Sequence, residues 1–172
     1  MDDVYRIIKT EASAEIKVKG SRFIGETCMV ATVDDALFRL EAIRKREYSA
    51  THHCYAYLVG LFKDQLLKYS DDGEPNGTAG KPIYDVIEGS GASNLLCVVT
   101  RYFGGTKLGT GGLVRAYGEA ARAAMDKSGI VEQFLTRRFR LVVEFSLYDQ
   151  WQRLVHDIGA QVVSSDYADV VT

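Results

Sequence analysis

Three carboxylates within four residues form the densest group of potential catalytic side chains in the sequence. Asp71, Asp72 and Glu74 lie in a segment rich in glycine and proline, which we call the acidic motif (residues 70–82). Carboxylate oxygens suit Mg²⁺, and two carboxyl groups in different environments can serve as acid and base. The alternative is an ordered loop, in which Asp side chains cap turns and glycines adopt positive φ.

A second glycine-rich segment, residues 101–112, is called the glycine motif. Eleven of the 16 glycines lie between residues 73 and 118. A glycine loop that leads from a strand into a helix N-terminus presents free N–H groups to an anion. Lys107 is not placed as in a phosphate-binding P-loop, because Thr110 follows Gly109 where that loop has lysine. The alternative is a structural elbow.

The candidates for anion or nucleic-acid binding share this motif or the first turn of the helix after it. Tyr102 is included because an aromatic ring can stack on a base. They are Arg101, Tyr102, Gly104, Gly105, Lys107, Gly109, Gly111, Gly112 and Arg115.

The charge of the chain is uneven along its length. The net charge is −2, but residues 101–140 contain eight Lys or Arg against three Asp or Glu. That local excess permits an anionic partner such as RNA, unless the charges face different directions after folding.

Composition predicts an ordinary globular protein of the cytoplasm. The 172 residues are 47% hydrophobic and 26% charged, and no apolar run approaches the ~18 residues of a membrane span. The first ten residues carry two acids where a secretory signal carries bases. We expect no membrane association, no cofactor and no bound metal.

Hydrophobic periodicity and capping residues predict the elements that position the two motifs. The helix over 112–127 has an apolar stripe at Leu113, Tyr117, Ala120, Ala121 and Ala124, opposite Arg115, Glu119, Arg122 and Asp126. The other expected elements are strands over 4–10 and 14–19 that form a hairpin around Glu11–Ser13, a strand over 22–31, a helix capped by Thr32 with Leu37, Leu40 and Ile43 inward, strands over 53–61 and 65–70, a short helix from Pro82 to Ile87 and a central strand over 94–101.

A second unit is expected from about residue 136. We predict a strand over 137–145, a helix opened by Ser146 and closed by Gly159, a strand over 160–166 and the start of another over 167–172. This order is half of a ferredoxin-like unit, and an unfinished sheet exposes an edge. We therefore expect either a shortened C-terminus or a partner that covers this edge. The partner can be another copy of the chain, so the oligomeric state stays open.

Several long segments resemble the IMPACT/YigZ family. The resemblance runs in order from about residue 16 to 130, and residues 137–172 resemble the start of the second domain of bacterial members. The matching segments are Ser21–Ile24, Ala50–Tyr57, Asp71–Pro75, Thr78–Gly80, Val99–Gly105 and Leu108–Tyr117.

The resemblance implies an α+β protein. Residues 1–131 would be an IMPACT-type domain with a ribosomal protein S5 domain 2-like fold. Residues 136–172 would be the first part of a ferredoxin-like domain, similar to a C-terminal domain of elongation factor G. Eukaryotic relatives act in translational control and carry an RWD domain that is not found in these 172 residues.

Two functions of different classes follow. The favoured one is a non-enzymatic protein linked to translation or its regulation, which contacts RNA or a ribosome-associated protein through a glycine-rich basic patch. The alternative is a metal-dependent enzyme acting on a phosphorylated small molecule, with Asp71, Asp72 or Glu74 as ligand or base. The missing phosphate-loop lysine and the lack of an obvious nucleophile favour the binding protein.

Overall fold

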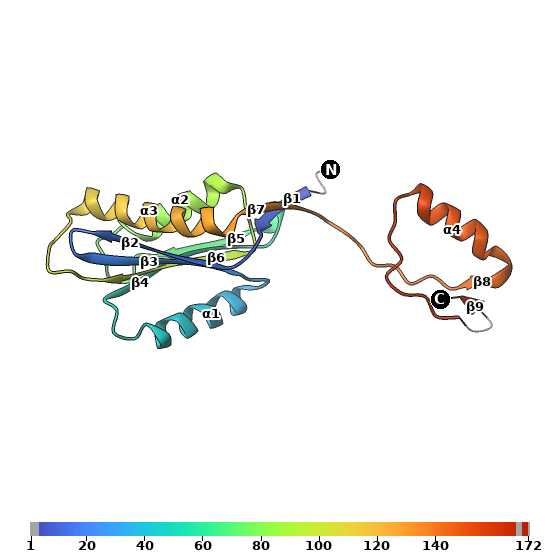
Figure 1. Cartoon of the computed structure of the whole chain (residues 1–172), viewed down its shortest axis with the longest axis horizontal. Coiled ribbons are helices and arrows are strands. Elements are labelled where there is room, and N and C mark those ends of the chain that lie inside the picture. Colours follow the sequence, from blue (N-terminus) through green and yellow to red (C-terminus); the bar gives the residue numbers. More distant parts are fainter. Residues whose placement is uncertain (1–3, 168–169, 172) are drawn as a thin grey trace. The chain divides into compact units, whose positions relative to one another are not determined.

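The computed structural model describes residues 4–167 and 170–171, and its contacts divide the chain into two compact units, residues 1–135 and 136–172. Unit 1 is built on a five-stranded sheet with the order β2-β3-β6-β4-β5, in which every neighbouring pair is antiparallel (Figure 1). Its strands are β2 (Ala12–Val18), β3 (Ser21–Met29), β4 (His52–Val59), β5 (Leu66–Ser70) and β6 (Leu95–Tyr102).

Helices cover both faces of this sheet. The helices α2 (Gly80–Ser90) and α3 (Thr110–Ser128) lie on one face and α1 (Val33–Arg46) on the other (Figure 1). Each face therefore has its own apolar core, one centred on residues such as Ile83 and Tyr117 and the other on Leu40 and Tyr57. None of the helices in the described ranges is both long and apolar enough to span a membrane.

Local signals predicted the central elements correctly. Strand β6 is in the middle of the sheet, and Leu95–Arg101 is buried because both faces are covered. Both predicted stripes of α3 are confirmed, since the apolar set is buried and the charged set is exposed. Thr32 caps α1, with its hydroxyl oxygen accepting the N–H of Asp35 at 3.1 Å.

The predicted hairpin around Glu11–Ser13 is wrong. Strand β1 (Val4–Ile8) pairs with the distant β7 (Ile130–Phe134), and β2 pairs with β3 instead. The β2–β3 turn consists of Lys19 and Gly20, both with positive φ, as a two-residue hairpin turn requires. Alternation shows that a segment is a strand, but it does not identify the strand that pairs with it.

The inward face of α1 differs from the prediction at one position. Leu37 is exposed, whereas Ala36, Leu40 and Ile43 are buried at spacings of four and three. On the helix surface Ala36 and Ile43 lie on the same side of Leu40, whereas Leu37 lies on its other side, so the buried stripe leaves Leu37 out.

Unit 2 has less regular structure than its periodicity predicted. The predicted helix is confirmed as a short 3₁₀ turn (Phe145–Leu147) followed by α4 (Tyr148–Asp157). The strand predicted over 137–145 is present only at β8 (Val143–Glu144), which pairs with β9 (Val170–Val171). The strand predicted over 160–166 is wrong, because the described residues there join no ladder. The last predicted strand overlaps β9, but residues 168, 169 and 172 lie outside the described residues. No residue of 136–167 is buried, so apolar residues there have no core that would favour a longer strand.

Candidate functional site

Asp71 binds the backbone of its own loop. Its two carboxylate oxygens accept the N–H groups of Gly77, Ala79 and Gly80 at 2.8–2.9 Å, which supplies acceptors for the start of α2. Burial acts to raise the pKa of Asp71, but these three backbone hydrogen bonds outweigh it and lower the pKa below its ordinary value. The Asp71 carboxylate thus caps the start of α2, and both of its oxygens already accept hydrogen bonds.

Asp72 is also committed to neighbouring elements. Its carboxylate accepts the N–H of His53 at 2.7 Å and pairs with Arg44 of α1 at 3.0 Å. The backbone carbonyl of Asp72 lies 2.7 Å from Nδ1 of His52. These contacts join the acidic motif to β4 and α1.

Glu74 is the centre of a buried polar network. Its Oε1 accepts the Arg101 guanidinium at 2.5 Å and the Tyr117 hydroxyl at 2.8 Å, and Nε2 of His52 lies 3.8 Å away. Glu74 and Arg101 are 9% and 5% exposed. The pair therefore fastens the acidic motif to β6 and α3, and the charge of Arg101 is neutralised inside the domain rather than presented to solvent.

Two aromatic rings enclose the Arg101 guanidinium. The ring centroids of Phe23 and Phe103 lie 5.3 and 5.5 Å from its central carbon. Only the Phe103 ring continues to the surface, where the residue is 49% exposed. The buried Arg101 guanidinium therefore packs against the ring of Phe103 and helps to position the start of the glycine motif.

Tyr102 has a structural role of the same kind. Its hydroxyl donates to Glu47 at 2.7 Å, and the Arg22 guanidinium lies over its ring at 5.1 Å. The hydrogen bond to Glu47, with burial second, raises the pKa of Tyr102. One ring face is thus already occupied by a cation.

The glycines of the glycine motif serve two different purposes. A Cβ on Gly104 would lie 1.9 Å from the carbonyl carbon of Gly20, so the motif packs directly on the β2–β3 turn. Gly105 and Gly109 have φ of +86° and +73°, and nothing lies within 4 Å of where their Cβ would be. The motif is therefore anchored at Gly104 and open beyond it.

The two remaining glycines lie in the first turn of α3. A Cβ on Gly112 would be 3.0 Å from the Leu108 Cβ, and one on Gly111 would be 3.9 Å from Arg115. Gly109 is the N-cap, and no side chain hydrogen-bonds there. Asp71 accepts the N–H of Gly80 at the start of α2, whereas within the described residues no side chain accepts an N–H group in the first turn of α3.

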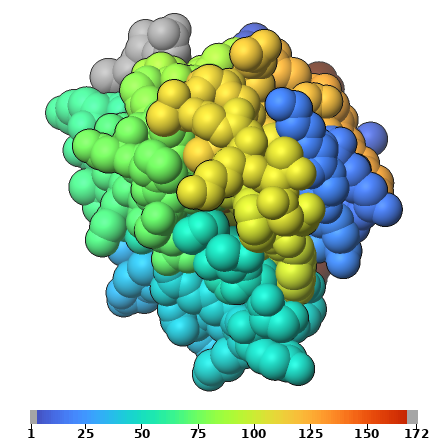
Figure 2. All heavy atoms as spheres, turned by 90° about the vertical axis from the view of Figure 1, so that its left-hand side faces the viewer, coloured from blue at the N-terminus to red at the C-terminus, as the bar shows by residue number. Residues whose placement is uncertain are grey.

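Two exposed cations flank this uncapped helix start. No carboxylate of the described residues lies within 4.0 Å of Lys107 or Arg115, and the Arg115 Nε donates to the Gly111 carbonyl at 3.2 Å. We call Phe103, Lys107, Arg115 and the N–H groups of residues 110–112 the basic patch. Figure 2 shows the end of unit 1 that carries it, with the glycine motif in yellow.

Contacts across this end confirm that the two motifs adjoin. Glu74 bonds to Arg101, the first residue of the glycine motif, and to Tyr117, which lies five residues after its end. The Phe103 N–H also bonds to the Thr51 hydroxyl at 3.2 Å. Sequence reasoning missed the buried network, although Tyr117 on the apolar stripe of α3 was a signal, because a buried tyrosine hydroxyl needs a partner.

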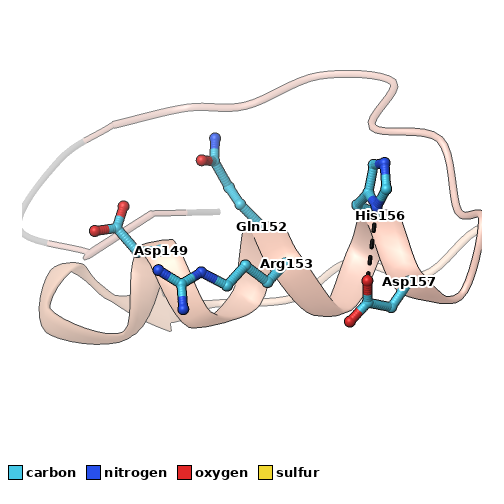
Figure 3. Close-up of a pocket in the computed structure, with 5 residues that line it drawn as sticks. All are labelled: Asp149, Gln152, Arg153, His156 and Asp157. Carbon is cyan, nitrogen blue, oxygen red and sulfur yellow. Dashed lines mark ion pairs between the residues drawn. The ribbon is translucent and has the colours of Figure 1, made fainter.

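Two hollows in the surface are lined by residues outside the basic patch. One of about 420 Å³ runs along the polar side of α4 and is lined by Asp149, Gln152, Arg153, His156 and Asp157 (Figure 3). Another of about 330 Å³ lies between α1 and the β2–β3 hairpin. Within the described part of the chain, no three His, Cys, Asp or Glu side chains are grouped as metal ligands.

Known proteins resemble this chain over most of its length. Residues 19–125 match the family model of the Impact N-terminal domain. The IMPACT family member YvyE of Bacillus subtilis is 42% identical over 133 residues, which are 77% of this chain and 61% of the relative. The IMPACT family member YigZ of Escherichia coli is 37% identical over 158 residues, 88% of this chain and 74% of the relative.

A solved structure agrees with the arrangement of elements. It is described as the crystal structure of a hypothetical protein, and it aligns with a TM-score of 0.75 and 34% identity over 99% of this chain and 84% of that one. The chain spans less than two thirds of the length of the Bacillus subtilis relative. The fold is a mixed α/β fold with antiparallel sheets, and it is shared with that solved structure.

Proposed function

Because the chain belongs to the family of the Impact N-terminal domain, we propose that it is a non-enzymatic binding protein linked to translation or its regulation. The link to translation comes from the eukaryotic relatives, which act in translational control. The proposed ligand of the basic patch is the phosphate backbone of RNA, with a ribosome-associated protein as the second candidate.

One observation carries the proposal for the basic patch. Lys107 and Arg115 flank an uncapped helix N-terminus, and no carboxylate of the described residues lies within 4.0 Å of either. A helix N-terminus with flanking cations favours a phosphate group. The partly exposed Phe103 ring adds a stacking surface for an unpaired base.

The enzyme alternative has less support. Asp71, Asp72 and Glu74 each accept at least two hydrogen bonds or ion pairs from the protein itself. A metal or a substrate proton would have to displace these contacts. Asp71 also binds the backbone of the acidic motif, and Glu74 fastens that motif to β6 and α3. We therefore assign these carboxylates to structure rather than catalysis.

We extend the proposal to the finer fold and the domains. Residues 1–131 would have the S5 domain 2-like fold, for which the layered sheet with α2 and α3 on one face is the support. Residues 136–172 would be the first part of a ferredoxin-like domain. The apolar residues of α4 support this, since Leu154 and the neighbouring Ile158 are 56% and 67% exposed and unit 2 has no buried core of its own among its described residues.

A salt titration of RNA binding tests the proposed function. With about three or four phosphate contacts, log K against log salt should have a slope of about −2 to −4, with micromolar affinity. The double variant Lys107→Ala and Arg115→Ala should lower the steepness by about 1.4 for single-stranded RNA. It should weaken binding to oligouridine and oligoadenine alike, because phosphate contacts carry no sequence information.

The control removes the same charge from another surface. Lys45 and Lys63 are exposed, and replacing both by alanine also removes two positive charges. Equal losses in the two double variants, or a flat salt dependence, would reject the basic patch as an RNA site. A protein partner would then be sought first, and a carboxylate-centred enzyme second.

A further inference from the structure

The two edges of the five-stranded sheet differ in what they expose. At one edge, β2 alternates between half-buried residues and exposed Ser13, Glu15 and Lys17. At the other edge, every residue of β5 from Leu66 to Tyr69 is exposed. Edge strands are usually protected by charges or short length. Strand β2 exposes two charged side chains, Glu15 and Lys17, whereas the shorter β5 exposes one, Lys68.

Large apolar side chains dominate the β5 edge. Leu66, Leu67 and Tyr69 are 59%, 43% and 43% exposed. Leu67 pairs with Leu58 and Tyr69 with Ala56, so both lie on the face covered by α2, where the Tyr69 ring stacks on Tyr84 of α2 with the centroids 6.0 Å apart. The apolar surface therefore continues from the edge strand onto α2.

The opposite face of β5 adds one unpaired charge. Lys68 pairs with Tyr57 and lies on the face of α1, and no carboxylate within the described ranges lies within 4.0 Å of its ammonium group. The only strand that pairs with β5 is β4, as far as the described residues show. Alternate N–H and C=O groups of β5 thus point away from the sheet.

We propose that β5 is a docking edge for an extended peptide segment of another protein, which adds antiparallel to the sheet and places an acidic side chain opposite Lys68. Apolar side chains of that segment would lie opposite Leu66, Leu67 and Tyr69. The pattern of the partner, read from its N-terminus, is apolar, acidic, apolar, apolar. This surface is separate from the basic patch.

Charge complementarity selects this occupant over a second copy of the chain. The two-fold register that pairs all of Leu66–Ser70 with itself is centred on Lys68. That register would place two ammonium groups directly opposite each other, which destabilises a cross-strand pair. An acidic residue at the same place replaces repulsion with attraction, and main-chain hydrogen bonds supply the rest of the affinity.

The test uses the full chain and two synthetic peptides. The first is acetyl-Ser-Thr-Val-Glu-Val-Ile-Ser-amide, and the second has Lys in place of Glu. The wild-type protein should bind the Glu peptide roughly three- to tenfold more tightly than the Lys peptide, as measured by fluorescence anisotropy of versions that carry fluorescein in place of the acetyl group. In Lys68→Glu the preference should reverse, while Lys17→Glu on β2 should leave it unchanged.

Nuclear magnetic resonance with the same peptides locates the binding surface. The N–H signals of Leu66–Ser70 should shift when the Glu peptide is added, and those of Ala12–Val18 should not. Shifts confined to β2, equal binding of both peptides, or no saturable binding up to about 1 mM would overturn the proposal. Concentration-dependent dimerisation abolished by Lys68→Glu would also overturn it, because the occupant would then be a second copy.

Discussion

The acidic motif and the glycine motif are neighbours with opposite character. In the acidic motif, Asp71 and Glu74 use their carboxylates to bind the protein itself. In the glycine motif, Lys107 is exposed, and Gly109 caps α3 with its backbone alone. The comparison teaches that a dense group of carboxylates can serve to hold a loop in place. The backbone N–H groups of the adjoining glycine motif remain available to a ligand.

The largest expected effect concerns the buried pair in the acidic motif. Glu74→Ala leaves the Arg101 guanidinium buried without its partner, so the free energy of unfolding should fall by about 3–5 kcal/mol. Urea denaturation of the full chain measures this loss. The control is Glu41→Ala, which removes an exposed partner of Arg44 and should cost at most about 1 kcal/mol. Similar losses in the two variants would mean that Glu74 does not hold the motifs together.

A smaller effect separates the anchored and open parts of the glycine motif. Gly104→Ala forces a Cβ into the backbone of the β2–β3 turn and should cost about 3 kcal/mol. Gly105→Ala meets no neighbouring atom and should cost only the ~1–2 kcal/mol of its positive φ. Thermal or urea unfolding of both variants distinguishes the two roles. A larger loss for Gly105→Ala would contradict the packing of Gly104 on Gly20.

The smallest expected effect is a pH dependence of Asp71. Its pKa is lower in the folded protein than in the unfolded chain, so its stabilisation is present above the unfolded pKa of ~3.9 and is lost as pH falls through the folded pKa. Asp71→Asn should therefore destabilise the protein by about 1 kcal/mol near pH 7. The difference between wild type and variant in urea unfolding should shrink as the pH falls below ~3.9. A difference that grows on acidification would show that the carboxylate form is not the cap.

Much of unit 1 could be predicted because its elements follow local rules. The run Leu95–Arg101 is apolar enough to be a central strand, and the apolar stripe of α3 repeats at helical spacing. The pairing of β1 with β7 could not be predicted, since more than 100 residues separate the two strands. In unit 2, residues 160–166 were predicted as a strand, but they have no ladder partner among the described residues.

The candidate site could be located but not interpreted from the sequence. Glycine density identified both motifs, and Lys107 and Arg115 are exposed as expected. The prediction that Arg101 belongs to an anion site relied on its charge. A charged side chain at the end of a buried strand can equally form an ion pair in the interior of the domain. That partner, Glu74, is 27 residues away, and only the folding of both motifs onto one end brings the pair together.

The most direct test of the central claim records backbone N–H signals during a titration with a short single-stranded RNA. Our account predicts that the signals of Thr110, Gly111 and Gly112 shift, because their N–H groups start α3 without a side-chain acceptor. The signals of Gly77, Ala79 and Gly80 should not shift, because Asp71 already accepts their N–H groups. Shifts in the acidic motif with none at residues 110–112, or no shifts in either, would contradict the account.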